Sequence, residues 1–287
     1  VIDNSKRSSA AIVYYSYLNE AKPWYKIVLG QILQLQQCQI LTQKRSPVRL
    51  YIHLTGLQPS LDVGLLFLKT ILKQLTWHRS PHIKVGEYHI STSTINNYEY
   101  PGIDLIWRLS QDYPDEPFLY FHSKGMFFHD QNGDERCHED KILFQELICP
   151  YDRILSIFDR YPRINKVGYM NDSQGWCWWN FWWARGSYLR VCEKPLLVSA
   201  QSGGNNGNNR WYYESWLSTG SDLSSRSDDC YDLYNNQIGI SFSPQQAGQI
   251  ICQKSLSSPK LNSSKMMAFY GHYGHFVNAS LVIVRYV

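Results

Sequence analysis

The feature that most constrains the fold of this sequence is the alternation of strand-sized and helix-sized segments before residue 123. Short runs rich in β-branched and aromatic residues alternate with stretches that carry an apolar residue every three or four positions. The expected strands are 11–18, 48–54, 82–90 and 118–122, and the expected helices are 24–38, 61–75 and 103–111. Strands joined by crossover helices run parallel. The pattern therefore predicts an α/β fold with a mostly parallel, Rossmann-like central sheet flanked by helices.

Composition excludes several classes of protein. Aromatic residues reach 15% and charged residues only 18%, so the chain is globular. The net charge of +4 is small and the basic residues are scattered, so we expect no nucleic-acid partner. No apolar run is long enough to be a transmembrane segment. The seven cysteines form neither a zinc pattern nor C-x-x-C. We therefore expect free thiols and a cytoplasmic protein, with membrane-peripheral attachment or a place in a longer multidomain protein as alternatives.

The first candidate site is the segment His122-Ser123-Lys124-Gly125, directly after an apolar strand. Open α/β sheets bind ligands at the carboxyl ends of their strands. An imidazole and an ammonium at that edge suit the charge of a diphosphate, and Gly125 allows a sharp turn of the backbone. The alternative is a strand end whose polar side chains face water.

Two aromatic segments in the second half are further candidates. Six of the eight residues from 176 to 183 are aromatic, which predicts either core packing or a wall on which sugar rings stack. Glu214 lies among aromatic residues that should raise its pKa toward the range of a general base. The alternative is a helical glutamate paired with Arg210. Between the two segments, the Gly- and Asn-rich residues 199–209 predict a mobile loop that closes over the donor.

Several familiar motifs are missing from the sequence. It contains no P-loop, no G-x-G-x-x-G, no G-x-S-x-G and no H-E-x-x-H. It also lacks a strand-end D-x-D, the usual clamp for a divalent cation on a nucleoside diphosphate. We therefore assign no metal ligands, leave Mn²⁺ or Mg²⁺ open as a cofactor, and expect Lys124 to neutralise the diphosphate.

Three segments, in this order, resemble a group of bacterial and large-virus glycosyltransferase-like domains. The group carries H-[ST]-K-G at a strand end, then G-N-F-W-W-A-R-x-x-Y-[IL], then R-[YW]-x-x-E-x-W. In this chain they read YFHSKG at 120–125, WNFWWARGSYL at 179–189 and RWYYESWL at 210–217. The likeness spans roughly residues 11–217. Trp179 departs from it, because it stands where the group usually has glycine.

The resemblance implies a GT-A-like fold in one domain over residues 1–287. Residues 11–125 would form the nucleotide-binding half, and residues 126–287 the sugar and acceptor half. Glu214 would be the catalytic base. The donor would contact Tyr14, Tyr15, Tyr17, Glu99, His122, Ser123, Lys124, Gly125, Asn180 and Arg185. The sugar and acceptor pocket would be formed by Trp179, Trp182, Trp183 and Tyr213.

The resulting hypothesis is an inverting glycosyltransferase. It would move a sugar from a UDP- or GDP-sugar to a hydroxyl group of a glycan or saccharide acceptor, as in polysaccharide biosynthesis. A carbohydrate-binding module without catalysis is one alternative, because aromatic walls also occur in lectins. A nucleotide-sugar hydrolase on the same sheet is another. A transferase that has lost its activity is a third, because the D-x-D motif is missing.

Overall fold

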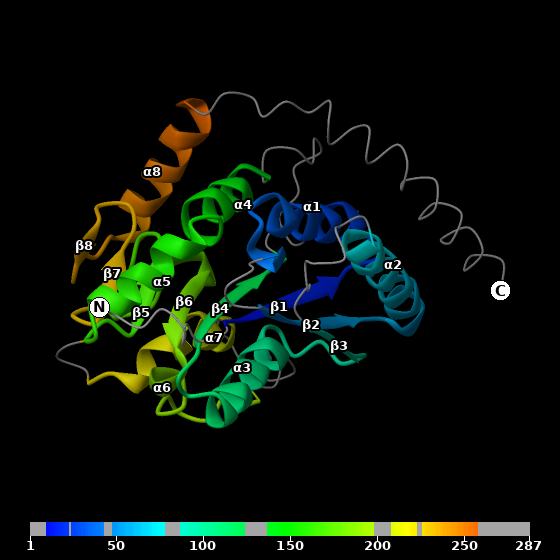
Figure 1. Ribbon diagram of the computed structural model, residues 1–287, viewed down its shortest axis with the longest axis horizontal. Coiled ribbons are helices and arrows are strands. Elements are labelled where there is room, and N and C mark those ends of the chain that lie inside the picture. The colour runs from blue at the N-terminus through cyan, green and yellow to red at the C-terminus, as the bar shows by residue number, and fades with distance from the viewer. Residues whose placement is uncertain are drawn as a thin grey trace.

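The computed structural model describes residues 10–22, 24–42, 48–77, 87–123, 137–197, 208–222 and 226–257. These residues form an α/β fold, in which helices cover both faces of one eight-stranded sheet (Figure 1). The strand order is β3-β2-β1-β4-β6-β5-β7-β8, so strands from both halves of the chain share the sheet. No helix within these ranges has the length and apolar character needed to cross a membrane.

The first four strands are parallel, as the sequence pattern predicts. β1 (Ala11–Leu18) lies between β2 (Arg49–Gly56) and β4 (Pro117–His122), and β3 (Tyr88–Ser93) pairs with β2. They are connected by α1 (Trp24–Gln37), α2 (Gln58–Trp77) and α3 (Tyr100–Asp112). β3 begins later than expected, and residues 82–86 of the predicted strand lie outside the described residues. The alternating half of the sequence therefore folds as its periodicity indicates.

The second half makes the sheet mixed, so the expectation of a mostly parallel sheet is confirmed only in part. β6 (Trp182–Arg185) runs antiparallel to both β4 and β5 (Lys166–Gly168). β7 (Cys230–Asp232) is parallel to β5, and β8 (Gln237–Ile238) is antiparallel to β7. The reason is that residues 169–181 reverse the chain between β5 and β6 without a crossover helix. The aromatic residues at 176–183 show no periodicity from which this reversal could be predicted.

Short helices complete the second half of the described chain. α4 (Cys137–Leu143) continues into the π-helical turn η3 (Phe144–Ile148), and α5 (Tyr151–Arg160) precedes β5. The 3₁₀ turn η4 (Trp178–Asn180) leads into β6, which is followed by α6 (Gly186–Leu189). The remaining elements are η2 (Ile40–Thr42), α7 (Asn208–Ser215), η5 (Trp216–Gly220) and α8 (Pro244–Ser257).

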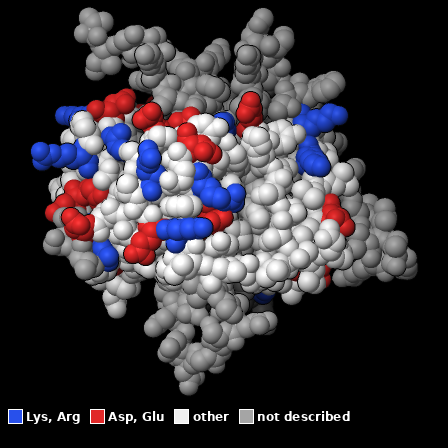
Figure 2. All heavy atoms as spheres, turned by 90° about the horizontal axis from the view of Figure 1, so that it is seen from below, with Lys and Arg blue, Asp and Glu red and all other residues white. Residues whose placement is uncertain are grey.

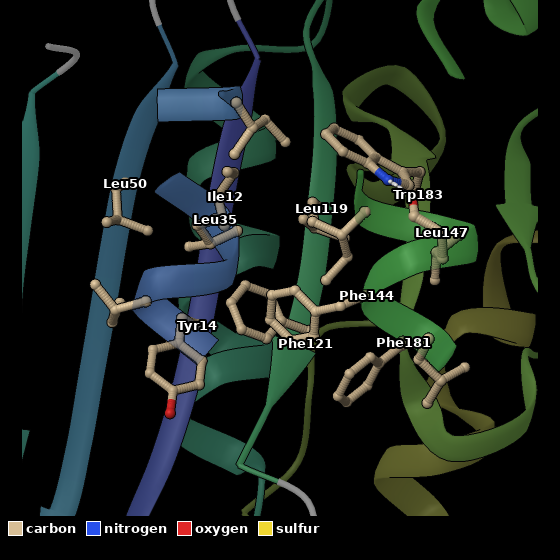
Figure 3. Packing of buried hydrophobic residues seen from close by; sticks show 14 of the residues in the cluster. Ile12, Tyr14, Leu35, Leu50, Leu119, Phe121, Phe144, Leu147, Phe181 and Trp183 are labelled. Carbon is tan, nitrogen blue, oxygen red and sulfur yellow. Dashed lines mark hydrogen bonds between the residues drawn. The ribbon is translucent and has the colours of Figure 1, made fainter. Parts of the chain in front are cut away.

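The core has two parts, one on each face of the sheet, because successive residues of a strand point to opposite faces. On the face covered by α1 and α4, Tyr14 stacks on Phe121 with ring centroids 4.7 Å apart, and Trp183 lies nearby (Figure 3). On the other face, Tyr120 stacks on Trp182 with centroids 5.2 Å apart. The alternation of side chains along β1, β4 and β6 thus places each aromatic residue in the core on one face of the sheet or on the other.

A disulfide joins Cys38, just after α1, to Cys149, just after η3. The expectation of free thiols is therefore wrong for these two residues. Cys177, Cys192 and Cys230 are buried and free, and Cys252 is exposed and free. The sequence could not predict the pair, because 111 positions separate its members and only the fold brings α1 next to η3. Disulfides are typical of oxidising compartments, so this one does not support the expected cytoplasmic location.

Candidate functional site

The strand order places a topological switch point between β1 and β4. β2 and β3 extend the sheet on one side of β1, whereas β4 lies on the other side. Because β6 is antiparallel, its amino end and the turn η4 reach the same edge as the carboxyl ends of β1 and β4. Ligands of open α/β sheets bind at such an edge. The fold therefore directs attention to His122, to η4 and to the loop that precedes α3.

Glu99 is the centre of a polar cluster at this edge. It lies directly before α3, and its carboxylate accepts hydrogen bonds from the Asn180 amide and from the Tyr120 hydroxyl at 3.3 Å. Its other oxygen lies 3.5 Å from Nε2 of His122. The side chains of Glu99 and His122 are only 17% and 11% exposed. Glu99 thus contacts both His122 and Asn180, two residues that the sequence analysis assigned to different segments.

The protonation of His122 follows from its partners. Its Nε2 lies 3.2 Å from the carbonyl oxygen of Trp179, which can only accept a hydrogen bond. Nε2 therefore carries a hydrogen. The carbonyl of His122 accepts a hydrogen bond from Gln31 at 3.2 Å, and the amide of Ser123 donates to the carbonyl of Tyr15 at 2.9 Å. These contacts fix the strand end. Lys124 and Gly125, which complete the predicted phosphate site, lie outside the described residues.

Backbone strain is concentrated around the Glu99–Asn180 contact. Tyr98, Trp179 and Asn180 have φ angles of 51°, 63° and 54°, in the left-handed region that favours glycine. Each such residue costs about 1–3 kcal/mol and persists only where its surroundings hold it. Here the indole of Trp182 donates to the Asn180 side-chain oxygen at 2.7 Å, and His122 holds the carbonyl of Trp179. Strain of this kind is typical of functional sites.

The predicted tyrosines of β1 divide between the two faces. Tyr15 and Tyr17 belong to the face that carries Glu99. Burial raises the pKa of Tyr15, and the nearby Glu99 carboxylate adds to the rise, so its phenol stays protonated. Tyr14 points to the opposite face, where it is fully buried against Phe121. Tyr15 therefore lies near Glu99 and Tyr17 lies on the same face, whereas Tyr14 lies on the opposite face.

Trp182 and Trp183 are core residues, which does not fit their predicted place in a pocket wall. Both are fully buried, on opposite faces of the sheet. The indole of Trp183 donates to the carbonyl of Leu147 at 3.0 Å. Arg185 pairs with Pro117, at the amino end of β4. His122 lies five residue steps along the strand from Pro117, about 16 Å, so the predicted contact of Arg185 with the phosphates does not fit its position.

α7 lies beside this cluster. The carbonyl of Tyr213 is 3.4 Å from the Asn180 amide, and the Tyr213 hydroxyl donates to the carbonyl of Leu196 at 3.0 Å. Glu214 follows Tyr213 and is 8% exposed. Its role as a base remains a prediction. Residues 198–207, most of the predicted mobile loop, lie outside the described residues, and α7 begins within its last two positions.

Sequence reasoning missed some residues of this edge. Tyr120 was assigned only to a strand, although its hydroxyl contacts Glu99. Asp172 lies on the connection from β5 to β6 and was not assigned to a site. The half-buried Trp176 and Trp178 lie on the same connection. They belong to the aromatic segment 176–183, for which the sequence left core packing and a sugar-stacking wall open, but they were not named among the individual pocket residues. Within the described ranges, no group of three or more His, Cys, Asp or Glu residues could hold a metal ion.

No protein-family model matches the chain, and no curated protein matches it.

The surface charges are mixed on the face seen in Figure 2, where Lys and Arg side chains lie among Asp and Glu. This face therefore has no continuous stripe of one sign, the feature that draws polyanions to a surface.

Proposed function

We propose that this protein is a glycosyltransferase with a GT-A-like fold. It transfers a sugar from a UDP- or GDP-sugar to a hydroxyl group of a glycan acceptor, with inversion. His122 and Lys124 hold the diphosphate. Glu99 accepts hydrogen bonds from the hydroxyl groups of the sugar donor, and Asn180 donates hydrogen bonds to them. Glu214 removes the proton of the acceptor hydroxyl. A divalent cation, Mn²⁺ or Mg²⁺, is an optional partner of the diphosphate.

The observation that carries this proposal is the Glu99–His122–Asn180 cluster at the β1/β4 switch point. The order β3-β2-β1-β4 matches the first four strands of a dinucleotide-binding sheet, whose ligand lies where the strand order reverses. A carboxylate, an imidazole and an amide that are nearly buried and held by strained backbone form a preorganised polar site. His122 and Asn180, from two of the resembling segments, thus both contact Glu99 at the edge where open α/β sheets bind their ligands.

The conformation of Trp179 supports the resemblance itself. Its φ of 63° is one that glycine adopts without cost, and glycine is the residue that the resembling group usually carries there. Trp179 in η4 therefore adopts a backbone conformation for which glycine, the usual residue of the resembling group, is the unstrained choice.

Ligand binding is the first test. A thermal-shift screen against UDP, GDP and their common sugar conjugates, with and without Mn²⁺, should raise the melting temperature for one nucleotide, because a ligand that binds the native state stabilises it. Product analysis with and without a saccharide acceptor then separates transfer from hydrolysis. A chain that binds saccharides but ignores every nucleotide is a carbohydrate-binding module, and that result would overturn the proposal.

The Glu214→Gln substitution tests the catalytic base. We expect the transfer rate to fall by about 10²-fold or more, because general-base catalysis contributes at least that much, while nucleotide binding is unchanged. Glu193→Gln is the matched control, since Glu193 is an exposed glutamate before the same segment. Near-normal transfer by the Glu214→Gln protein would show that another group is the base.

A further inference from the structure

The connection between β5 and β6 forms a hairpin at the ligand-binding edge. Asn171 and Cys177 form an antiparallel bridge, the amide of Asp172 donates to the carbonyl of Trp176 at 2.8 Å, and the amide of Trp178 donates to the carbonyl of Met170 at 3.1 Å. The hairpin (residues 170–178) continues directly into η4, which carries Trp179 and Asn180. Along the chain, only residues 176–179 therefore separate Gly175, at the tip, from Asn180 of the Glu99 cluster.

The hairpin is held rigidly from three sides. The amide of Phe242 donates to the carbonyl of Asn171 at 2.8 Å, and the carboxylate of Asp232 accepts from the amide of Met170 at 2.8 Å. At the tip, Gly175 has a φ of 82°, and a Cβ atom there would lie 2.2 Å from the carbonyl oxygen of Arg226. A surface hairpin with so many fixed contacts presents its side chains in one arrangement, which lowers the entropy lost when a ligand binds.

Two tryptophans project from this hairpin and are only half-buried. The rings of Trp176 and Trp178 meet edge to face, with centroids 4.4 Å apart. The indole N–H of Trp178 donates to the carbonyl of Phe242 at 2.9 Å, so its polar atom is satisfied and its ring is fixed in place. Trp178 also packs against the core, whereas Trp176 packs on Trp178. Fixed, partly exposed aromatic faces are the surfaces on which the C–H faces of a pyranose ring pack.

A carboxylate lies on the same hairpin. Asp172 is only 9% exposed, and its Oδ1 accepts a hydrogen bond from the amide of Gln174 at 2.7 Å. This contact fixes the side chain and uses only part of its capacity to accept hydrogen bonds, since an ionised carboxylate has about four acceptor sites. Burial raises the pKa of Asp172, which marks the charge as poorly solvated. Hydroxyl groups of a neutral saccharide are suitable donors for such a group.

We propose that the hairpin is the acceptor subsite, in which a neutral saccharide stacks on Trp176 and Trp178 and donates hydroxyl hydrogen bonds to Asp172. This inference rests on the proposed glycosyltransferase function and names the acceptor class of the same edge of the sheet. It moves the acceptor contacts from Trp182 and Trp183, which are in the core, to two neighbours that are partly exposed. Trp178 lies two residues before Asn180, so the hairpin is connected to the Glu99 cluster through η4.

Substitutions on the hairpin test this inference in a transfer assay. Trp176→Ala removes the outer ring, and Asp172→Asn removes the charge while keeping an oxygen for the amide of Gln174. We expect each to raise the acceptor KM about tenfold, with the donor KM unchanged, because the truncation of a central aromatic contact typically costs 1–2 kcal/mol or more. Trp107→Ala is the matched control, since Trp107 is also half-buried and also donates its indole N–H to a carbonyl, that of Cys192.

Saccharide binding without nucleotide distinguishes the two proposals. The unmodified protein and Trp176→Ala are titrated with glucose, galactose, mannose, N-acetylglucosamine, maltose, cellobiose and lactose, and binding is measured by calorimetry. Binding that is lost in Trp176→Ala supports the hairpin subsite, even where no nucleotide sugar is used as donor and the transferase proposal fails. An unchanged acceptor KM in both hairpin variants, an equal rise in Trp107→Ala, or no binding of any of these sugars by an inactive protein overturns it.

Discussion

His53 on β2 shows how burial controls the charge of a single residue. Its Nδ1 lies 2.8 Å from the hydroxyl of Ser91, and its Nε2 lies 3.3 Å from the hydroxyl of Ser93, which also contacts Thr55 at 3.0 Å. Burial lowers the pKa of His53 to about 4, and the positive charge of Arg108 adds to this effect. The imidazole is therefore neutral in the native protein at any pH above this value.

This histidine predicts how stability depends on pH. Between about pH 6.5 and 4 the unfolded chain binds a proton at residue 53 and the native protein does not, so the free energy of unfolding falls as the pH falls. We expect about 2–3 kcal/mol less stability at the lower pH. His53→Gln, which can keep hydrogen bonds to both serines, should flatten this slope in urea unfolding measured across the range. His89→Gln, at an exposed histidine of β3, should leave the slope unchanged.

At the scale of elements, the β5–β6 hairpin depends on one glycine. Gly175 has a φ of 82°, and its missing side chain leaves room for the carbonyl of Arg226. The hairpin determines that β6 runs antiparallel between β4 and β5, and it also holds Trp176 and Asp172 at the edge of the sheet. A change at this position should therefore affect both the sheet and the proposed acceptor subsite.

Gly175→Ala should lower the free energy of unfolding by about 2–4 kcal/mol, because it adds left-handed strain to a clash with fixed backbone. Gly248→Ala is the matched control. Gly248 lies within α8, a Cβ atom there meets nothing within 4 Å, and alanine in a helix interior should raise stability by about 0.5–1 kcal/mol. Opposite signs in denaturant unfolding are the expected result, and a neutral Gly175→Ala would show that the tip is not held as described.

The elements that the sequence predicts well are those with a regular apolar period. β1, α1, β2, α2, α3 and β4 appear within a few residues of their expected bounds. Glu99, His122 and Asn180 could be identified as polar residues next to such elements, but not as partners, because 81 positions separate Glu99 from Asn180. The faces of Trp182 and Trp183 could not be predicted, since they depend on the pairing of β6 with β4. Trp176 and Trp178 could be identified as members of an aromatic segment, but not as its partly exposed members, because exposure depends on the same pairing.

At the scale of the whole molecule, the Cys38–Cys149 disulfide joins the two halves of the chain. A crosslink over about a hundred residues removes much of the conformational freedom of the unfolded chain. Its members follow α1 and η3, which pack on the same face of the sheet as Tyr14 and Phe121. The bond therefore stabilises the contact of the first half with the second on one face.

Loss of this bond should lower the free energy of unfolding by about 2–4 kcal/mol. Thermal unfolding of the unmodified protein with and without dithiothreitol, compared with Cys38→Ser, measures the effect. Reduction and Cys38→Ser should give similar decreases, and dithiothreitol should have no further effect on Cys38→Ser. Cys252→Ser, at an exposed free thiol, is the control and should unfold like the unmodified protein. Equal melting temperatures in all samples would show that the bond contributes nothing.

The shared sheet has a mechanical consequence for any ligand at its edge. β4, from the first half, and β6, from the second, are joined by main-chain hydrogen bonds from Pro117↔Arg185 to Tyr120↔Trp182. Because paired strands join the two halves, the halves cannot open by a hinge motion, as separate domains do in proteins that close around their substrates. A ligand must then enter and leave past the segments that connect the strands at this edge, because the sheet itself is rigid.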